Sequence, residues 1–349
     1  MVRLAYVQFS KRIQWRLSSS SPRTFPLPGV SEWNLVNPLL YPVLPKKDEF
    51  GAQCNSFRDD KAFISSRNLV FVREDYPPGQ YDKNEFEHLR SLFAELLGRL
   101  RHESGQADMP KPEDLVMVMF GEIESLPEPP ALEPFGNVVT IQTYPLIAAV
   151  TERQYTAALK LPKDFTSPIH RILFLDAISA YLEHDFRVSI LFAAMAMEIA
   201  FGTALEEAYE AILASPDNPR YRVQTIPIGG GAFSIKDPIF DRLREKTDFS
   251  IRVHEMSLYV LGKSLRVDKE SLYKRALTLY RSRNKIVHLG TTDDAKEEVL
   301  VIDEKGAFAA VETASDCLSW LGLSSGAPLP KLAFVSGEEF SAFVDGLDV

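Results

Sequence analysis

The stretch "DFRVSILFAAMAMEIAFGTALEEAYEAILA", residues 185–214, decides the fold of the second half of this chain. It contains the longest apolar run of the sequence, from Val188 to Leu205, in which Glu198 is the only charged residue. A run that carries a carboxylate at its centre is more typical of a core helix than of a membrane span. We therefore expect a long helix in a protein core, and no membrane partner.

Further helical patterns on both sides of this run predict an all-α bundle over residues 165–325. The segment 167–185 precedes it almost without a loop, so the two helices should pack antiparallel. Ser167 is the expected N-cap of the first helix, with Pro168 in its first turn. After an expected loop over 215–235, helical patterns follow at 236–247, 253–265, 268–290 and 306–323.

Residues 1–150 show less helical periodicity, and they predict a separate mixed α+β domain. Two stretches, 62–72 and 137–150, concentrate β-branched and aromatic residues, which favours strands. Between them, 82–104 repeats apolar residues at helical spacing. A proline-rich loop or linker covers 125–136, and 326–349 is a tail without a clear pattern. The expected fold class is α+β, with a mixed N-terminal domain followed by a C-terminal helical bundle.

Composition limits the classes of protein that this chain can belong to. Apolar residues make up 45% of the chain and charged residues 25%, as in ordinary globular proteins. The two cysteines, Cys54 and Cys317, are too few for a disulfide framework and lack the spacing of zinc ligands. The first 17 residues are interrupted by charge, which is unlike a signal peptide. We expect a cytoplasmic protein without a metal or cofactor.

Positive charge is concentrated in one segment of an otherwise acidic protein. The net charge is −9, which disfavours indiscriminate binding of nucleic acid. From Lys263 to His288, however, there are eight Lys and Arg residues against two Asp and Glu residues. This basic segment is either a surface for a polyanion or only a solvated helix face.

The helix expected at 268–290 places polar groups on its apolar side. Helical spacing puts Arg283 in one stripe with leucine and alanine residues, and puts Asn284 and His288 in the adjacent stripe. An unpaired buried guanidinium is costly, so Arg283 needs a partner or a cleft. Glu198 is the expected partner, because it lies beside the face of its own helix that we expect to point inward. That inward face consists of Val188, Leu191, Phe192, Met195, Ile199 and Gly202.

The run "RNKIVH" at 283–288 resembles the R-N-x-x-x-H motif of the HEPN superfamily, the higher eukaryotes and prokaryotes nucleotide-binding domains. The similarity covers about residues 165–325 and favours the prokaryotic branch of defence and toxin ribonucleases. It implies a metal-independent endoribonuclease that acts as a homodimer. His288 would be the general acid and base, Arg283 would hold the phosphate, and Asn284 would support them. The solvent-facing basic residues expected to bind RNA are Lys274, Arg281 and Lys285.

Two other interpretations remain open, and two local sequence motifs are excluded. The bundle could be a catalytically inactive module that binds a partner protein or a nucleotide, with His288 only favouring the dipole at the end of its helix. The N-terminal domain could be the enzyme, although it shows no motif; as part of a nuclease it would sense a trigger or restrain cleavage. The segment "HEMSL" lacks the second histidine of a zinc protease because Leu258 takes its place, and "IGGGAF" lacks the lysine of a phosphate-binding loop.

Overall fold

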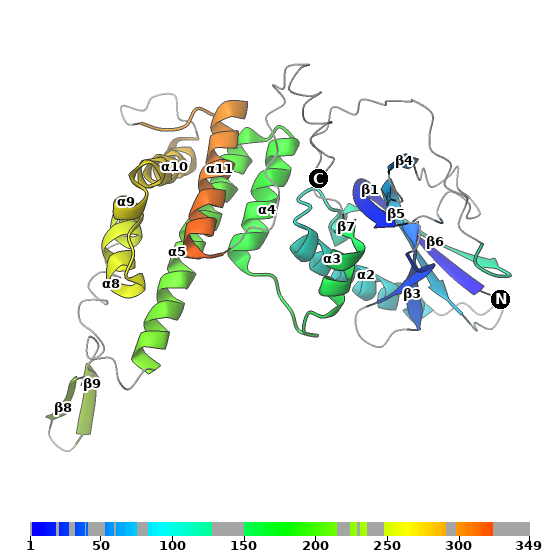
Figure 1. The fold of residues 1–349 in the computed structure, drawn as a ribbon, viewed down its shortest axis with the longest axis horizontal. Helices are drawn as coiled ribbons and strands as arrows, with labels where there is room; N and C mark the ends of the chain where they lie inside the picture. The colour runs from blue at the N-terminus through cyan, green and yellow to red at the C-terminus, as the bar shows by residue number, and fades with distance from the viewer. Residues whose placement is uncertain are drawn as a thin grey trace. The chain divides into compact units, whose positions relative to one another are not determined.

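The computed structural model describes two compact units, which are treated separately below (Figure 1). The first contains the described residues up to Ser167, and the second those within Pro168–Ser325. An antiparallel sheet and many helices are present, so the predicted mixed α+β class is confirmed. The residues described are 2–18, 21–27, 32–38, 40, 53–58, 61–74, 83–127, 150–214, 224–228, 231–235, 248–290 and 298–323.

A sheet in the order β2-β3-β5-β1-β6 forms the first unit. Its central strand β1 pairs antiparallel with β5 on one side and with β6 on the other. The strand predicted at 62–72 is confirmed as β5, and the part of the predicted strand before Val150 lies outside the described residues. The strands are β1 (Val2–Ser18), β2 (Thr24–Pro26), β3 (Trp33–Val36), β4 (Gln53–Arg58), β5 (Lys61–Arg73), β6 (Leu115–Ile123) and β7 (Val150–Thr151).

Alternate residues of β1 are buried on opposite faces of this sheet, as the pleat of a strand requires. Ala5 and Val7 belong to one core cluster, while Leu4 and Tyr6 belong to another. The first cluster also includes one face of α2 (Lys83–Ser104), which confirms the helix predicted at 82–104. The buried residues of α2 in this cluster are Leu89, Leu92, Phe93, Leu96, Leu97 and Leu100.

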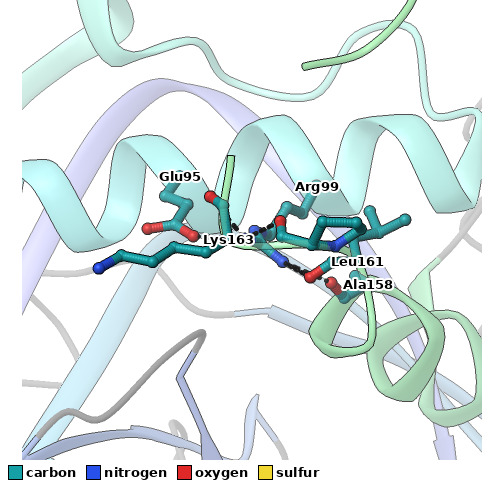
Figure 2. Close-up of polar contacts among 6 residues, drawn as sticks. Glu95, Arg99, Ala158, Leu161 and Lys163 are labelled. Atoms are coloured by element: carbon teal, nitrogen blue, oxygen red, sulfur yellow. Dashed lines mark hydrogen bonds and ion pairs between the residues drawn. The ribbon is translucent and has the colours of Figure 1, made fainter. Parts of the chain in front are cut away.

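A buried arginine of α2 satisfies the C-terminal end of α3 (Glu152–Leu159) (Figure 2). The side chain of Arg99 is 4% exposed and donates to the carbonyl oxygens of Ala158, Leu161, Pro162 and Lys163 at 3.2, 2.7, 2.8 and 3.3 Å. Its charge is balanced by Glu95, one helical turn earlier, at 2.6 Å. The last carbonyls of a helix lack partners within the helix, so Arg99 supplies the missing donors.

We expect Arg99→Ala to destabilise the first unit by about 3 kcal/mol, because four carbonyl groups lose a charged donor. Denaturant unfolding in a Trp320→Phe background measures this, since the remaining tryptophans, Trp15 and Trp33, both lie buried in the first unit. Arg90→Ala is the matched control, because Arg90 is an exposed residue of the same helix. A loss of stability no larger than that of the control would contradict the role of Arg99.

The second unit is built around the long helix α5 (Phe186–Ala214), as predicted for residues 185–214. It packs against α4, α10 and α11, and Figure 1 shows α4 and α11 beside it. Only Glu183–Asp185 separate α4 from α5. The remaining elements are α4 (Ile169–Leu182), β8 (Gln224–Ile228), β9 (Gly231–Ile235), α7 (Phe249–Ile251), the π-helix η3 (Arg252–Met256), α8 (Ser257–Leu261), α9 (Leu265–Asp268), α10 (Glu270–Leu289) and α11 (Glu304–Leu321).

The buried face of α5 differs from the predicted one. The six residues expected to point inward are all only half-buried. The fully buried face is made largely of small residues, including Ala193, Ala196 and Ala200. Small side chains let neighbouring helices approach closely, and the larger buried side chains of this face, Ile190, Met197 and Phe201, fill the space beside them. By length and composition alone α5 could cross a membrane; half of its most apolar window is buried inside the protein.

Two further predictions are corrected. Helix α4 begins after Pro168, and Ser167 does not cap it; the Ser167 hydroxyl lies 2.8 Å from Nδ1 of His102 instead. The expected loop over 215–235 contains an antiparallel hairpin, β8–β9, in the part that is described. The helix expected at 236–247 and the tail at 326–349 lie outside the described residues, as does most of the proline-rich segment 125–136.

Gly306, in the first turn of α11, is expected to tolerate no larger residue. A Cβ atom at this position would overlap the carbonyl oxygen of Val301, and the Gly306 amide donates to the capping carboxylate of Asp303 at 2.7 Å. Gly306→Ala should therefore destabilise the second unit by about 2 kcal/mol, measured by hydrogen exchange in α10 and α11. Gly202→Ala in α5, where a Cβ meets nothing within 4 Å, is the control and should be neutral or stabilising. Equal exchange in both variants would contradict the expectation.

Candidate functional site

Arg283 and Asn284 lie half-buried on α10, in a site shared with α5. The predicted contact between Arg283 and Glu198 is present: Nε of the arginine lies 3.6 Å from Oε1 of the carboxylate. Nη1 of Arg283 donates to Oδ1 of Asn284 at 2.8 Å. The guanidinium is therefore held on two sides, by a carboxylate of another helix and by the next residue of its own.

Glu198 is held in a partly desolvated place. Its side chain is 19% exposed, and burial raises the pKa of its carboxyl group above the ordinary value, while Arg283 and then Arg252 lower it. The sequence singled out Glu198 and Arg283, but it gave no reason to consider Arg252. The 3.6 Å separation from Arg283 is long for a hydrogen bond, so the carboxylate positions the guanidinium without saturating its donors.

Three aromatic rings fix the positions of α5, α7 and α10 beside this site. Phe249 of α7 stacks on Tyr280 of α10, with ring centroids 5.0 Å apart and planes inclined by 17°. The same Phe249 ring meets Phe201 of α5 edge-on, at 5.8 Å and 89°. Phe201 and Phe249 are almost fully buried, so the three rings form a rigid layer between the helices.

His288 is exposed, which differs from the prediction that it lies on the apolar side of its helix. It is one turn beyond Asn284, close to the end of α10, which closes at Gly290 with a left-handed φ of +73°. Its neighbours Val287 and Leu289 are 56% and 59% exposed. Among the described residues His288 forms no hydrogen bond or ion pair with Arg283 or Asn284, so one copy of α10 does not bring the two side chains of the motif together.

The three basic residues expected to bind RNA differ in their surroundings. Arg281 is exposed, as predicted, and Lys285 is half-buried. Lys274 is exposed and forms an ion pair with Glu270 at 2.8 Å, one turn earlier on α10. An exposed pair of this kind is weak, so Lys274 can exchange Glu270 for another anion at little cost.

The segment before α11 is tied to α10 next to Arg283. The buried hydroxyl of Ser282 accepts from the Leu300 amide at 2.8 Å and donates to the Thr278 carbonyl at 2.7 Å. This contact holds the chain that follows the basic segment against α10. Across the described ranges, no group of three or more His, Cys, Asp or Glu side chains is placed to hold a metal ion.

Comparisons with protein-family models, with curated proteins and with solved structures found no match to this chain. The function is therefore argued from the site itself and from the motif at 283–288.

Proposed function

We propose that the second unit is a HEPN-like helical bundle that cleaves RNA without a metal ion. The observation that carries the proposal is Arg283, oriented by Glu198 and Asn284 at the end of a basic helix that also bears the exposed His288. A guanidinium with free donors suits a phosphate, and an exposed imidazole suits proton transfer to a bound substrate.

The reaction needs two proton transfers and one site for negative charge. The 2′-oxygen of a ribose attacks the adjacent phosphorus, the 2′-hydroxyl proton passes to a base, and the bond from phosphorus to the 5′-oxygen breaks. The leaving 5′-oxygen takes up a proton, so the products are a 2′,3′-cyclic phosphate and a 5′-hydroxyl. In our proposal His288 exchanges the protons and Arg283 stabilises the charge that builds up on the phosphorane oxygens.

His288 and Arg283 of one copy do not contact each other, and in our proposal a homodimer brings them together. Two α10 helices that face each other across a two-fold axis would place His288 of one copy near Arg283 of the other. The exposed Val287 and Leu289, which flank His288, would be covered in such an interface. The dimer and its use of both copies are part of the proposal.

We assign the rest of the chain the roles that this reaction needs. The protein would be a cytoplasmic anti-phage or toxin effector, and its first unit would sense a trigger, bind a regulatory partner or restrain cleavage. RNA would be drawn to Arg281, Lys285 and Lys274, because the bulk of the protein is acidic.

Incubation of the purified chain with RNA and with DNA oligonucleotides of the same sequence, in EDTA, tests the proposal. We expect only the RNA to be cleaved, because DNA lacks the attacking 2′-hydroxyl. Sedimentation of the same sample should show a dimer. Cleavage of both polymers, or cleavage that stops when EDTA is added, would contradict the proposal.

The exposed position of His288 also supports a second candidate, an inactive module in which Arg283 and Glu198 are structural and the end of α10 binds a protein. This alternative would be favoured if the wild-type chain is a dimer, leaves RNA intact, and binds RNA no more tightly than Arg283→Ala does.

A further inference from the structure

A second arginine converges on the site from an element outside the motif. Arg252 is the first residue of the π-helix η3, which packs against α5, and its side chain is half-buried. The wider turn of η3 is fixed by Ser257, a fully buried residue whose hydroxyl donates to the Arg252 carbonyl at 2.8 Å. A π-turn inside a helix is often found where a side chain is redirected toward a functional site.

The aromatic layer explains why Arg252 lies near Glu198 and Arg283. Each ring of the layer has a polar residue of the site three positions away on its own helix, and residues three apart share a helix face. On α10, Arg283 follows Tyr280 by three residues, and on α7 and η3, Arg252 follows Phe249 by three. On α5, Glu198 precedes Phe201 by three.

The direction of the three helices places all three polar residues on one side of the layer. Glu198 precedes Phe201 on α5 and contacts Arg283, which follows Tyr280 on α10, so the two helices run in opposite directions where the rings connect them. The stacking of Phe249 between Tyr280 and Phe201 then brings the following turn, with Arg252, to the same level. The influence of Arg252 on the pKa of Glu198 agrees with this placement.

Charge within the cluster is not balanced. Its described members carry two positive charges, on Arg283 and Arg252, and one negative charge, on Glu198, so one positive charge is in excess in a partly desolvated place. A phosphodiester carries a single negative charge and several oxygens that accept from guanidinium groups. A phosphodiester can therefore balance the excess positive charge and accept hydrogen bonds from the guanidinium N–H groups that Glu198 leaves unused.

We propose that Arg252 is a second phosphate-binding residue of this site, acting with Arg283 on the RNA backbone while Glu198 positions the Arg283 guanidinium. The inference rests on the proposed function for the choice of RNA as the ligand. Its basis, however, is the convergence of the two arginines, which the R-N-x-x-x-H motif does not include.

Binding of a short, fluorescently labelled oligoribonucleotide to the full chain tests the inference. The measurements are made in a His288→Ala background, so that cleavage does not interfere. We expect Arg252→Gln to weaken binding about tenfold and to reduce the slope of log affinity against log salt by about 0.7, the value for one phosphate contact on a single strand. Arg252→Lys, which keeps the charge, should recover part of the affinity.

Arg187→Gln is the matched control, because Arg187 is an exposed arginine at the start of α5. Its affinity should differ from that of the His288→Ala background by less than about twofold. Thermal unfolding followed by circular dichroism establishes that each variant is folded.

The outcomes separate the inference from the proposed function. Unchanged affinity and salt slope in Arg252→Gln would overturn the inference, and RNA cleavage by the wild-type chain would then leave the proposed function standing. Weakened binding in a chain that never cleaves RNA would support the inference and overturn the proposed reaction. If neither the wild-type chain nor the His288→Ala protein binds RNA, and the wild-type chain does not cleave it, both are overturned.

Discussion

Replacement of His288 by alanine is expected to lower the rate of RNA cleavage by about 10³-fold or more, the largest effect of any single change in this chain. The side chain is exposed and forms no hydrogen bond or ion pair with another described residue, so its loss would remove the proposed proton transfer without disturbing the fold. The measurement is a single-turnover cleavage rate with enzyme in excess over a labelled oligoribonucleotide, which separates chemistry from product release.

Two comparisons make this prediction specific. His88→Ala, at an exposed position of α2 in the first unit, should cleave RNA at the wild-type rate. The affinity of His288→Ala for RNA should stay within about threefold of wild type, since a group that acts in the transition state contributes little to ground-state binding. A His288→Ala protein that cleaves at more than a tenth of the wild-type rate would rule out the assigned role.

The second large effect is expected from Arg283→Ala, which should lower the single-turnover rate by about 10²- to 10³-fold. The guanidinium that would stabilise the phosphorane is lost, and Glu198 is left half-buried without its nearest cation. Arg283→Lys keeps one positive charge but not the planar group that contacts Glu198 and Asn284 together, so its rate should recover only in part.

Glu198→Gln distinguishes positioning from catalysis at this site. An amide keeps the size and shape of the carboxylate but carries no charge to attract the guanidinium of Arg283, so we expect a fall of about tenfold in cleavage, smaller than that of Arg283→Ala. Arg187→Ala, on the exposed start of α5, should leave the rate unchanged. A larger loss in Glu198→Gln than in Arg283→Ala would mean that the carboxylate itself takes part in the chemistry.

The elements that the sequence predicted well are those with a single buried face. The regular spacing of Leu89, Phe93 and Leu96 was enough to predict α2, and the apolar stripe through Leu272, Ala276 and Leu279 predicted α10. The contact of Glu198 with Arg283 was predictable for a related reason. A charged group on an apolar helix face needs a partner, and few were available.

The buried face of α5 could not be predicted, because the helix itself carries apolar residues on nearly all of its faces. Periodicity then gives no preferred direction, and the sequence favours large residues such as Phe192 and Met195 as the core. The structure instead buries Ala193, Ala196 and Ala200, where α4 and α11 pack closely.

The strand β1 was not predicted for a different reason, the charged residues within it. The charged residues of this segment interrupt its apolar pattern, but Arg3 is buried and paired with Glu85 at 3.0 Å. Both faces of this central strand are covered, so the alternation of polar and apolar residues that identifies a half-exposed strand is absent. A buried ion pair between distant parts of the chain leaves no local pattern in the sequence.

Arg252 was also outside the reach of sequence patterns. Its distance of three residues from Phe249 has meaning only once Phe249 is known to stack on Tyr280 and to meet Phe201. The π-turn that follows likewise depends on Ser257, whose backbone amide and hydroxyl both donate to the Arg252 carbonyl. These are properties of packing among three helices.

The central claim is that residues at the end of α10 catalyse the attack of the ribose 2′-hydroxyl on the adjacent phosphorus. The most direct test is to identify the ends of RNA fragments produced in EDTA by the wild-type chain and by His288→Ala, side by side. We predict fragments with 2′,3′-cyclic phosphate and 5′-hydroxyl ends from the wild type only. Fragments with 3′-hydroxyl and 5′-phosphate ends, or equal cleavage by the two proteins, would contradict the claim.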